Sequence, residues 1–290
     1  MGYLGEEAWY WIDAYGNEYL LGTDDTKTRF IREYGGVDMP EPVHITERSP
    51  GYHGTVHRGW HYNERTITLG ITLRPGSRAG LWDAMGSLRQ VLNLVRGKGK
   101  LKAIIPTAAP AATYTRYIDC RVNAPFNAGS DNQPNTQSQN AVLQFTASWP
   151  LFYDPTEQVS RKAFNGSTLQ SLVVDNAGEE YAWPRYVIYP PANYAQVRLA
   201  GSPSDYMLLR YDITAATGPV TIYVVPIAKD DAYGKRAIGA YGEDLTYLVS
   251  KESRWFGIPP GRQTLQIAAT YGGTGRVDVF WHNEYLGLGG

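Results

Sequence analysis

Apolar and polar residues alternate along much of this chain, which is the pattern of β-strands that bury one face. The clearest case is residues 65–74. There, Ile67, Leu69, Ile71 and Leu73 would point to one side and the intervening threonines to the other. A slip of one residue would exchange the two sets, so the register of this strand is well determined.

Similar stretches elsewhere predict a mainly β protein. In the first half, strands are expected at residues 8–13, 18–21, 26–32, 43–48, 101–105, 113–122 and 141–149, the first two forming a hairpin. In the second half they are expected at residues 171–175, 183–189, 195–199, 207–211, 220–225, 245–249, 264–267 and 277–281. The turn at Pro259-Pro260-Gly261 precedes the strand at 264–267, and the Gly-rich reversal 271–275 separates it from the strand at 277–281.

One amphipathic helix interrupts this β pattern. Ser77, after Pro75-Gly76, is a suitable N-cap, and Gly97 is placed to end the helix. Between them, apolar residues recur at steps of three and four, as on one helical face: Leu81, Met85, Leu88, Leu92 and Val95. The expected role is a core helix laid over a sheet.

The length of 290 residues favours two domains. A polar stretch rich in helix and strand breakers follows residue 153 and divides the chain. The boundaries predicted from this are a first domain at 1–153, a linker at 154–170 and a second domain at 171–290. Aromatic residues make up 13% of the chain, a share that suits both short strands and interfaces.

Charge and cysteine content restrict the possible partners and compartments. A net charge of −1 gives no general attraction to nucleic acid. The single cysteine, Cys120, cannot form an internal disulfide, so the chain needs no oxidising compartment. We expect no secretion signal, no lipid anchor and no membrane-spanning segment.

The histidines are the first candidates for a metal site. Four of the five histidines lie close together in the sequence: His44, His53, His57 and His61. The last three are spaced at i, i+4 and i+8, which would align them on a helix, and steps of four also share a face of a regular strand. Glycines at 51, 54 and 59 interrupt the segment, which favours polar loop or interface histidines. Metal ligation stays open as the alternative, and no cofactor is expected.

Other reactive constellations are missing from the sequence. The pairs Glu179-Glu180 and Asp230-Asp231 are adjacent in sequence, whereas catalytic carboxylates must face each other across a substrate. No nucleophile elbow or phosphate-binding loop is present, and residues 131–135 lack calcium-loop spacing. Residues 129–140 are entirely polar and are expected to form a solvated loop, while Tyr233, Tyr241 and Tyr247 could stack on sugars, meet a protein or fill the core.

The end of the chain resembles the C-terminal domain of the distal tail proteins of long-tailed bacteriophages. The resemblance rests on an aromatic-bearing strand at Trp255, the Pro260-Gly261-Arg262 turn, a Val-x-Val-x-Trp strand ending at Trp281, and Tyr285-x-Gly287. Further similar features are Asn176-x-Gly178 before Pro184, residues 50–69 with the capped helix after them, and the strand ending Ser148-Trp149-Pro150. Residues 229–244 are an insertion relative to this pattern.

This resemblance implies a fold and an assembly. The fold would be an N-terminal β-sandwich belt domain with one inserted α-helix, followed by a galectin-like, jelly-roll β-sandwich. Six copies would form a ring at the virion tail tip, after synthesis in the host cytoplasm. The tail tube protein, the tail-tip hub protein and the tape measure protein would be partners, with receptor-binding or side-fibre proteins on the second domain, and the genome would pass through without specific binding.

A second hypothesis is a carbohydrate-binding module or an accessory domain of a cell-surface-degrading enzyme. The aromatic content and the sandwich form support it. The lack of a secretion signal and of any hydrolase pattern in the first domain argues against it. An enzyme in its own right is not expected.

Overall fold

The computed structural model describes residues 7–23, 28–48, 53, 55–107, 113–123, 127–128, 138–165, 168–226, 234–270 and 274–288. The chain divides into two compact units. Unit 1 contains residues 1–152 together with 286–290, and unit 2 contains residues 153–285. The chain therefore passes from one unit to the other twice.

Unit 1 is built from antiparallel strands that follow one another closely in sequence. They are β1 (Ala8–Ile12), β2 (Glu18–Thr23), β3 (Arg29–Gly35), β4 (Pro42–Glu47), β5 (Val56–Tyr62), β6 (Arg65–Leu73), β7 (Lys98–Pro106), β8 (Thr113–Val122), β9 (Asn127–Ala128), β10 (Gln139–Ala147) and β11 (Phe152–Tyr153), which ends at the boundary of the unit. The pairing of β2 with β3 is the exception, being parallel at Thr23 and Phe30.

The main sheet of unit 1 folds over so that its two halves face each other. Its strands pair in the order β8-β7-β1-β2-β3-β6-β10, and β10 also pairs with β8. Trp11 of β1 stacks on Phe145 of β10 with ring centroids 5.3 Å apart, although these strands are not neighbours in the sheet. The two layers of the expected sandwich are thus parts of one sheet, with the core between them.

Strand β6 has the predicted register. Ile67, Leu69, Ile71 and Leu73 are all fully buried, and β10 pairs with this strand along its whole length. Along β10, buried and more exposed positions alternate as the sequence predicts.

Helix α1 (Arg78–Val91) starts as predicted and ends earlier. The Oγ of Ser77 accepts a hydrogen bond from the N–H of Gly80 at 3.1 Å, and Leu81, Met85 and Leu88 are buried. A 3-10 turn, η1 (Leu94–Arg96), follows, and its N-cap Asn93 accepts from the N–H of Val95. This local bond competes with helix continuation, so Val95 is 90% exposed, which corrects its expected place on the buried face.

Unit 2 contains two stacked antiparallel sheets. One has the order β12-β20-β14-β17-β18, and the other β13-β19-β15-β16. The strands are β12 (Gln158–Asn165), β13 (Gln170–Asn176), β14 (Arg185–Tyr189), β15 (Ala192–Leu199), β16 (Tyr206–Ile213), β17 (Val220–Tyr223), β18 (Arg236–Ile238), β19 (Gly261–Ala268), β20 (Thr274–Trp281) and β21 (Glu284–Tyr285), which lies outside both sheets.

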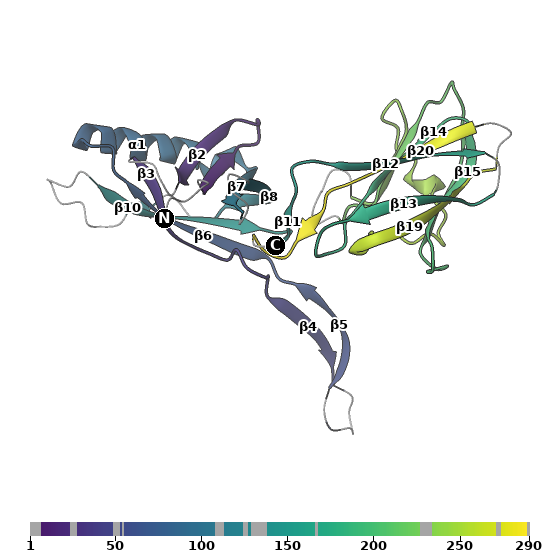
Figure 1. Cartoon of the computed structure of the whole chain (residues 1–290), viewed down its shortest axis with the longest axis horizontal. Helices are drawn as coiled ribbons and strands as arrows, with labels where there is room; N and C mark the ends of the chain where they lie inside the picture. Colours follow the sequence, from purple (N-terminus) through teal and green to yellow (C-terminus); the bar gives the residue numbers. More distant parts are fainter. Residues whose placement is uncertain are drawn as a thin grey trace. The chain divides into compact units, whose positions relative to one another are not determined.

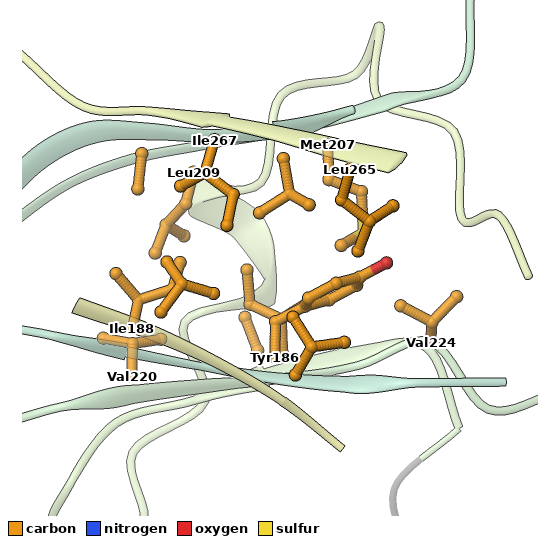
Figure 2. Close-up of a cluster of buried hydrophobic side chains, with 14 of the residues drawn as sticks. Tyr186, Ile188, Met207, Leu209, Val220, Val224, Leu265 and Ile267 are labelled. Carbon is orange, nitrogen blue, oxygen red and sulfur yellow. The ribbon is translucent and has the colours of Figure 1, made fainter. Parts of the chain in front are cut away.

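The core of unit 2 lies between its two sheets. Figure 2 shows Met207, Leu209, Leu265 and Ile267 on one side, facing Tyr186, Ile188, Val220 and Val224 on the other. All eight side chains are buried. Burial of aliphatic area on this scale is the main force that holds two sheets together. The prediction of a mainly β protein with two sandwiches and one helix is confirmed.

Several boundaries differ from those expected. Residues 158–165, expected in a linker, form β12, which pairs with β20 over its whole length. Residues 245–249, expected as a strand, contain the 3-10 turn η2 (Thr246–Leu248), because the Asp244 carboxylate accepts from the N–H of Thr246. Residues 286–290, expected in the second domain, belong to unit 1.

A buried asparagine joins three segments of unit 2. The Nδ2 of Asn176 donates to the carbonyls of Glu180 and Ile258, each at 2.9 Å, while its Oδ1 accepts from the N–H of Gly178. A side chain at Gly178 would collide with the backbone of Glu284. The Asn-x-Gly pattern therefore has a structural cause: a fully satisfied polar side chain and a close backbone approach.

Candidate assembly surface

The hairpin of β4 and β5 is mostly exposed to solvent. Among the described residues, its two strands pair only with each other, as a separate two-stranded sheet. Figure 1 shows the hairpin extending away from the main sheet. An isolated two-stranded sheet is at best marginally stable in water, so this geometry favours a covered state.

Large apolar side chains on this hairpin are open to solvent. Ile45 is 50% exposed, Val56 51% and Trp60 51%. Trp60 packs edge-on against Tyr62, with ring centroids 4.9 Å apart. Aromatic side chains with one open face are typical of interface centres.

A β-bulge sets which side chains share a face of the hairpin. His44 lies opposite Trp60 and Thr46 opposite His57, so one extra residue, Arg58, is accommodated between these pairs. His57 and Trp60 therefore lie on the face of His44, although they are three residues apart. His61 lies opposite Val43, on the other face.

The bulged residue is held by an ion pair. The Nε of Arg58 donates to Oε2 of Glu47 at 2.7 Å, and both side chains are exposed. An exposed pair of this kind contributes little stability, about 0–1 kcal/mol. Its effect is to fix the direction of Arg58 at the bulge.

The base of the hairpin is firmly anchored in unit 1. Next to it, the buried Arg65 donates from Nη1 to the carbonyl of Gly36 and from Nη2 to that of Leu286, at 3.3 and 2.6 Å. Its guanidinium also lies 4.8 Å from the centre of the Phe152 ring. Burial lowers the pKa of Arg65, which nevertheless remains charged at neutral pH.

The returning C-terminal segment completes this anchor. The N–H of Leu288 donates to the carbonyl of Val37 at 3.0 Å, and the hydroxyl of Tyr114 donates to the carbonyl of Leu288. The side chain of Leu288 is buried. Residues about 130 positions beyond β11 thus hold together the segments that flank the hairpin.

The histidines of the sequence analysis are not brought together as their spacing suggested. The bulge puts His57 and His61 on opposite faces, and His53 is an exposed residue before the strand. In the described part of the chain, no group of three or more His, Cys, Asp or Glu side chains could hold a metal ion. His57 instead meets His44, the fourth histidine of this region, which is not part of the evenly spaced set.

The other candidates are equally dispersed. The backbone N–H groups of Glu179 and Glu180 both donate to the carbonyl of Glu284, and a carboxylate oxygen of Glu180 accepts from the N–H of Tyr181. This pair forms part of a turn. Cys120 is fully buried, which raises the pKa of its thiol. Residues 129–137, 230–231 and 233 lie outside the described residues.

Unit 2 also displays aromatic side chains. Tyr241, between β18 and η2, is 82% exposed, and Tyr247, within η2, is 78% exposed. The hydroxyl of Tyr241 donates to the carbonyl of Ala216 at 3.2 Å, which fixes the direction of its ring. Of the three possibilities open for these tyrosines, core filling is wrong for Tyr241 and Tyr247.

Strand β5, the partner strand of the hairpin, was not predicted from the sequence. Glycines around residue 55 suggested an irregular loop, whereas residues 56–62 form β5. The signal that could have found it is the content of β-branched and aromatic residues in Val56, Trp60 and Tyr62. Among the described residues, no helix is long and apolar enough to cross a membrane.

No protein-family model and no curated protein matches the chain by sequence. Its structure resembles the Dit protein (gp 19.1) of phage SPP1, described as a paradigm of the hub adsorption apparatus in phages that infect Gram-positive bacteria. The TM-score is 0.66 at 15% identity, with 96% of this chain and 98% of that chain covered.

The chain has the fold of the phage Dit protein. Two structures of the phage p2 baseplate in its activated conformation, with Ca and with Sr, each contain a chain that is similar at a TM-score of 0.51 and 10% identity. Both cover 96% of this chain and 98% of the other. The Dit fold therefore extends over both units, as the resemblance in the sequence implied.

Proposed function

We propose that this protein is a distal tail protein, a structural component of a long-tailed phage virion without catalytic activity of its own. Six copies form a ring at the tail tip, with unit 1 as the ring-forming belt. The ring joins the tail tube protein to the tail-tip hub protein, and the tape measure protein ends nearby. Unit 2 is the attachment point for receptor-binding or side-fibre proteins.

The observation that carries the proposal is the Dit fold over 96% of this chain and 98% of the SPP1 protein. A match of both units excludes a similarity that rests only on one common sandwich, because sandwiches occur in many unrelated proteins. A ring-forming role also gives the exposed hairpin of β4 and β5 a partner. In a closed ring each copy contacts its two neighbours through two different surfaces. The hairpin offers apolar side chains on both of its faces, Trp60 on one and Ile45 and Val56 on the other.

The charge of the chain supports a passive channel. The net charge is −1, with 27 basic and 28 acidic residues. A strongly basic ring would bind the phosphate backbone and slow the passing genome. A nearly neutral ring lets DNA pass without specific binding.

The test is the mass of the purified full-length protein by light scattering, followed by negative-stain imaging, first alone and then with the tail tube protein. We expect six-fold rings in at least the second sample. A protein that stays monomeric in both samples at high concentration contradicts the proposal.

The alternative is a carbohydrate-binding module, favoured by the exposed rings of Tyr241 and Tyr247. Aromatic rings with an open face can stack on sugars, although they serve protein interfaces equally well. Binding of a cell-wall glycan by a monomeric full-length chain, lost in the Tyr241→Ala and Tyr247→Ala variants, would favour this function. Six-fold rings that bind no glycan would exclude it.

A further inference from the structure

Two imidazoles converge on one face of the exposed hairpin. The Nδ1 of His44 on β4 lies 3.3 Å from the Nε2 of His57 on β5. The ring centroids are 5.4 Å apart, with an angle of 60° between the ring planes. The pair is diagonal across the strands, since His44 lies opposite Trp60 and His57 opposite Thr46.

The separation of the two nitrogens suits a shared metal ion. Without an ion the contact is a long hydrogen bond, since an N–H donor usually lies about 2.9–3.0 Å from its acceptor. Two imidazole nitrogens bound to one tetrahedral ion at about 2.0–2.1 Å stand roughly 3.3–3.4 Å apart. We propose that His44 and His57 chelate one divalent transition-metal ion, Zn²⁺, Ni²⁺ or Cu²⁺, with water in the remaining positions.

The donor set determines the class of ion. Neutral imidazole suits zinc, copper and nickel, whereas calcium and magnesium require oxygen ligands. The nearest carboxylate along β4 is that of Glu47, which is held by Arg58. The two histidines are exposed, so an ion can reach them without any opening of the fold.

The β-bulge is what creates this site. In a regular hairpin, His57 would share a face with His61, and the pair with His44 could not form. Because Arg58 is the extra residue, His57 turns to the face of His44. The same register leaves His61 behind the sheet, opposite Val43, where it serves as a natural control.

Metal binding would link the two strands of a hairpin that pairs with no other strand in the described part of the chain. An ion held by both imidazoles stabilises the paired state by mass action, because the separated strands offer only single ligands. The hairpin therefore becomes more rigid when loaded, whether or not the chain forms a ring.

The test is calorimetric titration of the full-length protein, without an added histidine tag, with Cu²⁺ and with Zn²⁺. The variants are His44→Ala, His57→Ala and His61→Ala, each checked by circular dichroism for an unchanged fold. The wild type and His61→Ala are expected to bind one ion per chain with similar affinity. Loss of either ligand should weaken binding at least about tenfold, since even outer-shell changes cost that much. We also expect Cu²⁺ to bind more tightly than Zn²⁺.

Hydrogen exchange of the hairpin provides a second readout. Zn²⁺ should slow exchange in peptides from residues 42–62 of the wild type and of His61→Ala, and leave both other variants unchanged. The proposal is overturned if His44→Ala and His57→Ala bind as tightly as the wild type. It is also overturned if His61→Ala loses as much affinity as they do, because the ion would then lie elsewhere.

Discussion

Strands β5 and β6 are neighbours in the chain, separated only by Asn63 and Glu64, yet they use their apolar residues in opposite ways. In β6, all four aliphatic side chains of one face have no exposed surface. In β5, Val56 and Trp60 are each about half exposed. Strand β6 therefore stabilises the core of unit 1, whereas β5 contributes almost nothing to that core.

The difference shows that apolar residues in this sequence serve two purposes, folding of the unit and contact with another molecule. A buried aliphatic side chain contributes about 1.5–3 kcal/mol by leaving water, and only the folded unit is needed for that gain. A half-exposed tryptophan gains the rest of its burial only when another surface covers it. We infer that β6 is a folding element, and that the hairpin is a surface for another molecule.

The largest expected effect comes from making the same substitution, isoleucine to alanine, once in the core strand and once in the hairpin. Ile71→Ala on β6 should lower the free energy of unfolding by about 4 kcal/mol, because it leaves a cavity in a closed core. Ile45→Ala on β4, where the side chain is 50% exposed, should change it by less than about 0.5 kcal/mol. Denaturant unfolding of the unassembled chain measures both. Equal losses would mean that the hairpin belongs to the core.

The next effect concerns the returning C-terminal segment. Leu288→Ala should lower the stability of unit 1 by about 2–3 kcal/mol, because its side chain is buried between distant segments. Leu94→Ala, at a side chain that is 53% exposed, is the matched control and should have little effect. Hydrogen exchange should show faster exchange in β6 and β8, with β14 and β17 unchanged. If hydrogen exchange became faster only in unit 2, the segment would stabilise unit 2 instead of unit 1, and the prediction would be wrong.

A smaller effect is expected at the polar centre of unit 2. Asn176→Ala removes three hydrogen bonds at a fully buried position and should cost about 2 kcal/mol. The neighbouring Asp175→Ala, on the exposed side of β13, is the control. Thermal unfolding followed by calorimetry should show the transition of unit 2 shifted and that of unit 1 in place. If the unfolding temperature of unit 2 were unchanged in Asn176→Ala, water would be replacing the side-chain amide at no cost in stability, and the prediction would be wrong.

Local patterns predicted most of the fold, because alternation reports directly on which face is buried. The register of β6, the N-cap at Ser77 and the positive φ of Gly261 at the Pro-Gly turn could all be read from a few adjacent residues. Strand β12 could not, because its residues alternate weakly and its partner, β20, lies more than 100 positions away. The return of Leu288 to unit 1 depends on partners equally distant in sequence.

The candidate site was predicted less well, for a related reason. The spacing of His53, His57 and His61 assumes a regular strand or helix, and one bulge at Arg58 is enough to separate them. A bulge depends on how two strands pair, which no local pattern encodes. His44 entered the site only because β4 pairs with β5 in this shifted register.

The proposed ring requires that another copy of the chain covers the hairpin, and sedimentation velocity can measure whether it does. The comparison is between the wild type, an Ile45→Ser/Trp60→Ser variant, and a Tyr15→Ser/Val95→Ser control whose sites are 82% and 90% exposed. Each is measured under the conditions in which the wild type assembles. We expect a six-chain particle for the wild type and the control, and a folded monomer for the hairpin variant. A hairpin variant that assembles as fully as the wild type would contradict it.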